Sequence, residues 1–168
     1  MSALHPDESS GDEVETPDDL FEVLYNEFHF CIDVCAKSEN RKLGSYWGPD
    51  RFPTTVRDAL AFQWPSQYEA LNSFWMNPPY SRDLISKFME KACRESREGA
   101  TIVCLVRDDP SAKWYQNYVD GCAKEVRRLK RRVKFKGQKS CYPFPCCIVI
   151  YTPEEVTETK YVLWDWKE

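Results

Sequence analysis

The sequence contains little glycine and histidine, and it lacks the patterns that most readily reveal a function. Of its 168 residues, six are glycine and two are histidine. No apolar run approaches the roughly 20 residues that a membrane-spanning helix needs, and no basic stretch precedes an apolar one as in a secretory leader. The glycine-rich phosphate motifs GxGxxG and GxxxxGK(S/T) are both missing, which removes the main support for NAD or ATP binding. We therefore expect an intracellular, cytoplasmic protein with no membrane partner.

The eight cysteines follow neither a zinc pattern nor a disulfide pattern. No two of them have the Cys-x-x-Cys spacing typical of zinc sites, and only His5 and His29 could assist them. Several lie in apolar runs such as CIDVCA, TIVCLV and CCIVIY, as buried thiols of a reducing compartment do. We expect free thiols and no metal ion.

The acidic residues are concentrated at the start of the chain. The sequence has 23 Lys and Arg against 27 Asp and Glu, which gives a formal net charge of −4. Five of the acidic residues lie in the first 15 positions, which contain no Lys or Arg and few apolar residues. This composition is typical of a solvated tail. We expect an acidic flexible tail over residues 1–15 and a single domain over residues 16–168.

The basic residues are also concentrated. Residues 124–139 contain nine Lys and Arg and one Glu. Such a segment attracts phosphate groups whatever the net charge of the chain, but it is also typical of the solvated face of surface strands. The sequence alone leaves both interpretations open.

Helix-like and strand-like segments alternate along the chain. Thr16-Pro17 begins a run of apolar residues at helical spacing, with Thr16 as the expected N-cap and Pro17 in the first turn. Further helices are expected over residues 81–98 and 110–123, and strands over 28–33, 74–76, 100–106, 126–135, 146–151 and, as an edge strand or packed tail, 161–166. This order predicts an α/β fold with a mainly parallel twisted sheet, an antiparallel edge and helices on both faces. Ligands of such sheets bind beyond the carboxyl ends of the strands.

The tetrapeptide Asn77-Pro78-Pro79-Tyr80 follows one of these strand ends. Because proline has no N–H group, the carbonyls of Asn77 and Pro78 are left without local partners. A planar amine can donate one hydrogen bond to the Asn77 amide oxygen and one to the Pro78 carbonyl, which frees its nitrogen lone pair for attack. Tyr80 offers a flat face on which a planar substrate stacks. The alternative is a proline-rich turn with a packed tyrosine.

Asp33 ends another expected strand, at a position where nucleotide-like cofactors bind in many α/β folds. Its carboxylate is suited to hold a ribose hydroxyl or a cationic amine. Val34-Cys35-Ala36 replaces the glycine-rich turn of a dinucleotide site, yet the small Ala36 still allows a ligand to approach the backbone. The alternative for Asp33 is a helix-capping or surface acid.

Four segments together resemble a known family. They are Thr16-Pro17-Asp18-Asp19-Leu20-Phe21, residues 30–36 with Asn40, Asp58-Ala59-Leu60 with Trp64, and Asn77-Pro78-Pro79-Tyr80-Ser81. In this order they resemble the phage-type, Dam-like DNA adenine-N6 methyltransferases, and weaker similarity extends to about residue 152. These enzymes use S-adenosylmethionine and have a Rossmann-like class I methyltransferase fold. The resemblance implies the same fold, cofactor and DNA substrate here. It also implies a location in the host cytoplasm if the chain is phage-encoded.

The resemblance also implies a cofactor site. The implied cofactor-binding residues are Thr16, Pro17, Asp33, Cys35, Ala36, Asn40 and Asp58. Thr16 and Pro17 would border the methionine end of the cofactor, and Asp33 would hold its methionine or ribose part. Asp58 would bind its adenine amine.

The implied catalytic residues are Asn77, Pro78, Pro79 and Tyr80. A base inside a duplex hides its amine, so the target adenine would be flipped into this pocket. Contacts with DNA phosphates are then expected from the basic segment, namely Arg128, Lys130, Arg131, Arg132, Lys134, Lys136 and Lys139. The chain would act as a monomer or a homodimer.

Other functions share these motifs. The same tetrapeptide occurs in methyltransferases that act on RNA base amines or on glutamine amides of proteins, and cytosine N4 also presents a planar amine. A methyltransferase-like module that binds nucleic acid without catalysis is a further alternative, as is a purely structural α/β domain.

Overall fold

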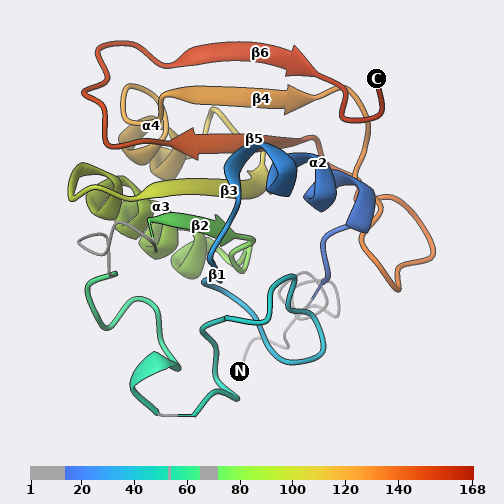
Figure 1. The fold of residues 1–168 in the computed structure, drawn as a ribbon. Coiled ribbons are helices and arrows are strands. Elements are labelled where there is room, and N and C mark those ends of the chain that lie inside the picture. Colours follow the sequence, from blue (N-terminus) through green and yellow to red (C-terminus); the bar gives the residue numbers. More distant parts are fainter. Residues whose placement is uncertain (1–13, 53, 65–71) are drawn as a thin grey trace, which may run out of the picture.

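The computed structural model describes residues 14–52, 54–64 and 72–168, which form one six-stranded sheet with helices (Figure 1). Across the sheet the strands lie in the order β1-β2-β3-β5-β4-β6. Their bounds are Ile32–Asp33 (β1), Ser73–Met76 (β2), Thr101–Arg107 (β3), Glu125–Leu129 (β4), Cys146–Tyr151 (β5) and Lys160–Trp164 (β6). The prediction of an α/β fold is confirmed.

Five of the six strands run in the same direction. The pairs β1–β2, β2–β3 and β4–β6 are parallel, whereas β5 is antiparallel to both of its neighbours, β3 and β4. The sheet is therefore mainly parallel, but the prediction that its antiparallel strand lies at the edge is wrong. All six side chains of β5 are buried, since this apolar strand has a neighbour on each side and a cover on each face. The two edge strands are β1 and β6, and each pairs in parallel with its neighbour.

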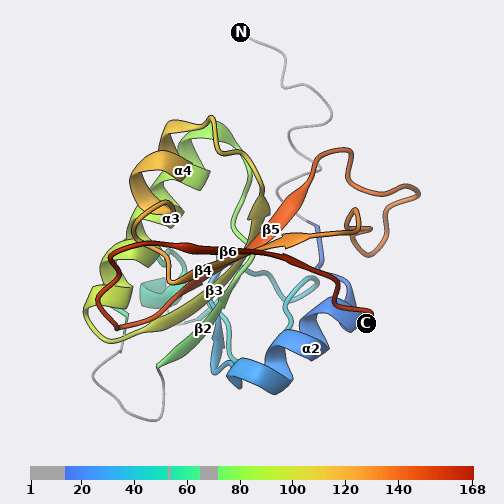
Figure 2. The same ribbon diagram turned by 90° about the horizontal axis from the view of Figure 1, so that it is seen from above.

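Helices cover both faces of the sheet, as predicted (Figure 2). Helix α2 (Asp18–Phe28) lies on one face, and α3 (Arg82–Arg97) and α4 (Lys113–Tyr118) lie on the other; a short 3-10 helix, η1, covers Thr54–Val56. Trp75 belongs to the apolar cluster of α2, whereas its neighbour Phe74 belongs to the cluster of α3. Successive side chains of a strand point to opposite faces, so an uninterrupted apolar strand such as β2 requires a helix on each side.

The ends of α2 differ from the sequence prediction. Thr16 is not the N-cap, because the helix begins at Asp18 after Pro17 and has no side-chain capping bond. The Thr16 hydroxyl instead accepts a hydrogen bond from Asn77. The helix continues to Phe28 and ends at His29, which has a positive φ of 50°. The strand predicted over residues 28–33 is consequently reduced to Ile32–Asp33.

Two later elements are also shorter than predicted. The helix predicted over residues 110–123 is reduced to Lys113–Tyr118. The strand predicted over residues 126–135 ends at Leu129, because the chain then leaves the sheet and meets the segment before α2. There Glu15 and Lys136 form an antiparallel bridge. The last residue predicted to belong to the acidic tail thus contacts the folded body.

All eight cysteines are free thiols, as predicted. Four of them are buried, and these are Cys93, Cys104, Cys146 and Cys147. Within the three described ranges, no helix has the length and apolar character needed to cross a membrane.

Polar residues lie together at the carboxyl ends of the parallel strands, which form one edge of the sheet perpendicular to the strands. Asp33 ends β1, Asn77 directly follows β2, and Lys130 directly follows β4. Asp33 and Trp75 are partners in the parallel register of β1 and β2, which places Asp33 close to the start of the Asn77 turn. This edge is where parallel sheets bind ligands.

Candidate active site

The side-chain amide of Asn77 is held by the segment that precedes α2. Its Nδ2 donates to the carbonyl oxygen of Val14 at 3.4 Å and to the hydroxyl of Thr16 at 3.3 Å. Because a carbonyl oxygen only accepts, the amide oxygen Oδ1 of Asn77 must point away from Val14. On that side Oδ1 accepts a long hydrogen bond of 3.4 Å from the Tyr80 hydroxyl. An amide oxygen has two lone pairs, so Oδ1 retains capacity to accept from a substrate amine.

The Pro78 carbonyl is the second acceptor of the same turn. Pro78 and Pro79 have no N–H groups to engage it. Among the described residues, no backbone N–H donates to it either. The turn therefore presents two oxygens of the kind predicted for binding an amine.

Tyr80 is held by its hydroxyl as well as by its ring. The hydroxyl donates to the carbonyl oxygen of Leu105 at 3.1 Å, and the ring packs edge-on against Phe135 and Tyr142. Burial raises the pKa of Tyr80 well above its usual value, so the hydroxyl remains a hydrogen-bond donor near neutral pH. These contacts fix the direction of the tyrosine ring beside Asn77. Stacking of a substrate on that ring stays a prediction.

A cavity of about 240 Å³ opens beside this turn. Its lining includes six residues predicted to form the site, namely Cys35, Ala36, Asn40, Asp58, Asn77 and Pro79. Trp47 and Phe88 supply apolar walls. Asp58 is exposed and accepts the backbone N–H of Leu60 with Oδ1 at 2.9 Å, which leaves the second carboxylate oxygen without a partner among the described residues. The structure thus brings the predicted amine acceptor and most predicted cofactor residues to one cavity.

The predicted site residues outside the cavity lining are Asp33, Thr16, Pro17, Pro78 and Tyr80, and Pro78 is buried. Asp33 is 2% exposed, and its two carboxylate oxygens accept the backbone N–H groups of Cys35 at 3.4 Å and Lys42 at 3.0 Å. Burial raises its pKa to about 6. Asp33 therefore fastens both ends of the loop that lines the cavity, and its direct contact with a cofactor stays a prediction.

Gly48 lies where two backbone segments approach each other at the cavity wall. Ala36 donates its N–H to the carbonyl of Trp47 at 3.1 Å, and Gly48 donates its own to Val56 at 3.2 Å. A Cβ atom on Gly48 would lie 1.6 Å from the Ala36 carbonyl oxygen. Only glycine permits this approach.

Acidic residues distant in sequence neutralise part of the basic segment. Arg128 pairs with Asp108 at 3.1 Å and Arg131 with Asp165 at 2.7 Å, while Lys136 pairs with Glu15 and Asp18. Four members are exposed and form no ion pair with any described residue, and these are Lys130, Arg132, Lys134 and Lys139. These four keep a charge that no described acidic residue compensates, and their contact with phosphate stays a prediction.

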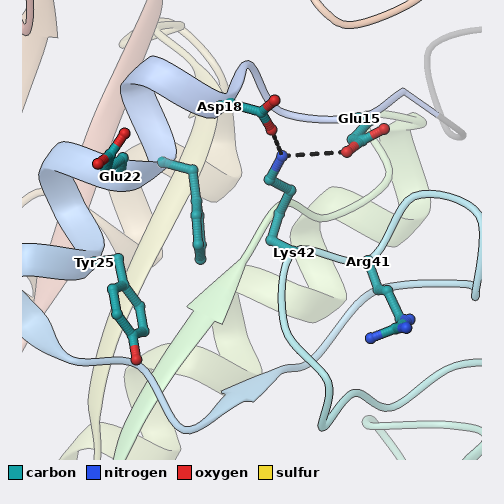
Figure 3. Close-up of a pocket in the computed structure, with 7 residues that line it drawn as sticks. Glu15, Asp18, Glu22, Tyr25, Arg41 and Lys42 are labelled. Atoms are coloured by element: carbon teal, nitrogen blue, oxygen red, sulfur yellow. Dashed lines mark hydrogen bonds and ion pairs between the residues drawn. The ribbon is translucent and has the colours of Figure 1, made fainter.

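The sequence did not single out Lys42. Its side chain is only 5% exposed, and its ammonium lies 3.2 Å from Glu15 Oε1 and 2.6 Å from Asp18 Oδ1 (Figure 3). The same ammonium donates to the Thr16 carbonyl at 2.9 Å. A second, open cavity of about 350 Å³ borders these groups. The only sequence signal was proximity to Asn40, because the hydrogen-bond acceptors of the Lys42 ammonium are 24 or more positions away.

An aromatic cluster beside Tyr80 was also missed. Tyr142 lies between Tyr80 and Phe144, with ring centroids 5.8 Å and 5.6 Å away, and the guanidinium of Arg107 lies 3.6 Å above the Phe144 ring. Phe144 is 41% exposed. Because these residues come from three segments of the chain, no local pattern could reveal them.

Comparisons with known proteins agree with the motifs. A family model described as DNA N-6-adenine-methyltransferase (Dam) matches residues 4–156. The DNA N-6-adenine-methyltransferase of Haemophilus phage HP1 (strain HP1c1) is 30% identical over 112 residues, which is 66% of this chain and 57% of the phage protein. The chain thus spans little more than half the length of that relative. Among the described residues, no cluster of three or more His, Cys, Asp or Glu side chains is arranged to hold a metal ion.

Proposed function

Since the chain belongs to the DNA N-6-adenine-methyltransferase (Dam) family, we propose that it transfers a methyl group from S-adenosylmethionine to the N6 amine of adenine in DNA. The observation that carries this proposal is the shared cavity. Asn77 and Pro79 border it from the turn after β2, and Asp58, residues 35–37 and Asn40 border it from the other segments. A methyl donor in the cavity would therefore lie directly beside the group that accepts the target amine.

The cavity suits S-adenosylmethionine chemically. Asp58 offers a carboxylate oxygen to an adenine amine, and Trp47 offers an aromatic wall. Ala36 and Gly48 both line the cavity, and the small side chain of Ala36 suits a close approach of a ligand to the loop backbone. When bound, the cofactor supplies an electrophilic methyl group on a sulfonium. The Rossmann-like class I assignment of residues 16–168 is supported by the five co-directional strands and by this cavity at their carboxyl ends.

The residues of the turn would act by orienting the target amine. Asn77 Oδ1 and the Pro78 carbonyl would each accept one amine hydrogen, which draws the nitrogen toward a tetrahedral geometry and directs its lone pair into the cavity. Transfer then requires the correct approach more than acid or base chemistry. The adenine must leave the duplex to reach this position, and Tyr80 would support it by stacking.

The exposed cations beside the site would bind the DNA backbone. Lys130, Arg132, Lys134 and Lys139 follow the carboxyl end of β4, at the same edge of the sheet as Asn77. Each phosphate contact adds affinity that does not depend on base sequence and that falls with salt. Arg128, Arg131 and Lys136 belong to the same surface, but their ion pairs with acidic residues would have to break before these side chains could bind phosphate.

Reversal of Arg132, Lys134 and Lys139 to Glu should weaken duplex DNA binding by roughly tenfold or more at low salt. It should also reduce the slope of the logarithm of the binding constant against the logarithm of salt concentration by about two to three. The measurement is fluorescence anisotropy over a salt series. The matched control reverses Arg97, Lys124 and Lys160, which lie at the amino ends of β3, β4 and β6: Arg97 ends α3 before β3, Lys124 directly precedes β4, and Lys160 begins β6. Equal effects of the two triple variants would contradict the DNA-binding proposal and favour the interpretation of the basic segment as an ordinary solvated surface.

The decisive test of function is transfer of a labelled methyl group to unmethylated duplex DNA, RNA and protein in parallel. We expect label on adenine N6 of DNA. Label confined to RNA or to glutamine would replace the DNA proposal with one of the alternative substrates. Calorimetry with S-adenosylmethionine tests the remaining alternative, a non-catalytic module. Binding of the cofactor without methyl transfer to any substrate would indicate such a module.

A further inference from the structure

The ammonium of Lys42 is a buried cross-link between two segments of the candidate site. It donates to Glu15 Oε1 and to Asp18 Oδ1 (Figure 3). It also donates to the Thr16 carbonyl, so all three of its N–H bonds have acceptors. Its side chain is only 5% exposed. Of its two carboxylate partners, Glu15 is 23% exposed and Asp18 is 71% exposed. The bonds to Glu15 and to the Thr16 carbonyl are therefore the ones least weakened by solvent.

The segment that Lys42 holds is the one that contacts the amide of Asn77. Val14 and Thr16 accept from Asn77 Nδ2 on one side. On the other side Glu15 accepts the backbone N–H of Lys136 at 2.9 Å with its carbonyl oxygen. Thr16 is 1% exposed, so the segment is enclosed between the turn after β2 and the chain after β4.

The backbone of Lys42 belongs to the loop that lines the cavity. Its N–H donates to Asp33, whose other oxygen accepts from Cys35. One residue thus joins the cavity loop, through its backbone, to the segment over Asn77, through its side chain. The two connections are chemically separable, because a side-chain substitution leaves the backbone bond to Asp33 in place.

We propose that Lys42 is a positioning residue that sets which way the Asn77 amide faces. This inference rests on the proposed methyl transfer. The carbonyl of Val14 and the hydroxyl of Thr16, clamped by the Lys42 ammonium, favour the rotamer in which Nδ2 of Asn77 faces them and Oδ1 faces the substrate. Without the clamp the amide can rotate by half a turn and present N–H groups to a target amine, where two donors oppose each other and no hydrogen bond forms.

The test compares steady-state methyl transfer by Lys42→Met and wild type, with Lys91→Met as the matched control. Lys91 is also a largely buried lysine, 10% exposed and paired with Glu95 at 2.6 Å, but it lies on α3 away from this segment. We expect Lys42→Met to lower kcat roughly 10- to 100-fold, the scale of small errors of position, with the KM values for DNA and S-adenosylmethionine within about twofold. Lys42→Arg should recover part of the loss, and Lys91→Met should leave kcat unchanged.

A second measurement isolates the cause. In an Asn77→Asp background both side-chain oxygens accept, so orientation loses its importance and Lys42→Met should cost a much smaller factor than in the wild type. An equal factor in both backgrounds, or unchanged kcat in Lys42→Met alone, would overturn the inference. Loss of activity in Asn77→Asp as complete as in Asn77→Ala would also count against it.

Two further outcomes remain distinguishable. If Lys42→Met does not fold, Lys42→Gln against Lys42→Arg decides, because only the glutamine removes the charge, and the inference then requires a lower kcat in Lys42→Gln than in Lys42→Arg. If the wild type methylates no DNA, the proposed function fails, whereas an active wild type with an unaffected Lys42→Met variant refutes only the role of Lys42.

Discussion

Asn77→Ala should lower methyl transfer to DNA by about 100-fold or more while S-adenosylmethionine still binds. The alanine removes the Oδ1 acceptor that we assign to the target amine, and loss of one well-placed polar group at a reacting centre costs about 2.7–4 kcal/mol of transition-state stabilisation in comparable cases. Cofactor binding is expected to remain because most of the cavity lining comes from other segments. Single-turnover transfer and calorimetry on the same preparation measure both properties.

The control for this substitution lies at the other end of the same strand. Asn72 directly precedes β2 and is exposed, whereas Asn77 directly follows it. Asn72→Ala makes the same chemical change without removing a proposed acceptor, so transfer should stay at the wild-type rate. If Asn77→Ala retained that rate as well, binding of the target amine by the turn would have to be abandoned.

Gly48→Ala should strongly destabilise the folded protein. The new Cβ would lie 1.6 Å from the carbonyl oxygen and 2.8 Å from the carbonyl carbon of Ala36. Both are backbone atoms, so relief requires the two segments to separate and the bond between Ala36 and Trp47 to break. We expect a loss of about 3 kcal/mol or more in the free energy of unfolding, measured by urea denaturation, together with weaker S-adenosylmethionine binding.

Gly44→Ala provides the comparison for Gly48→Ala. Gly44 is exposed, and the nearest atom to a Cβ at that position is the end of the Arg41 side chain at 3.9 Å. A methyl group fits there without strain, so the free energy of unfolding should change by less than about 0.5 kcal/mol. A similar small change in Gly48→Ala would show that the cavity loop moves easily, contrary to the tight approach described above.

Local sequence could predict the parts of the site in which the candidate residues directly follow the end of a strand. Asn77 after β2 and the loop after Asp33 were recognisable because buried strands are apolar and their ends are marked by prolines or polar residues. In the structure Asn40, Asp58 and Asn77 line one cavity. Their roles toward a cofactor and a base remain predictions.

The parts that could not be predicted depend on contacts between distant segments. Thr16 has every local mark of an N-cap, yet its hydroxyl bonds to a side chain 61 positions away. The charge of Arg131 is likewise compensated by Asp165, 34 positions later. Helix propensity and local charge describe only the neighbours along the chain, so a tertiary partner can change the role of a residue without leaving a trace in its own segment.

The central position of β5 has a consequence for the order of assembly. Strands β4 and β6 reach the rest of the sheet only through β5, although β5 follows β4 in the sequence. During synthesis, β1, β2 and β3 can therefore associate early, whereas β4 must wait unpaired until residues 146–151 have emerged and inserted beside β3. The basic segment that follows β4 reaches its place beside the Asn77 turn only after that insertion, so the DNA-facing edge is completed late in folding.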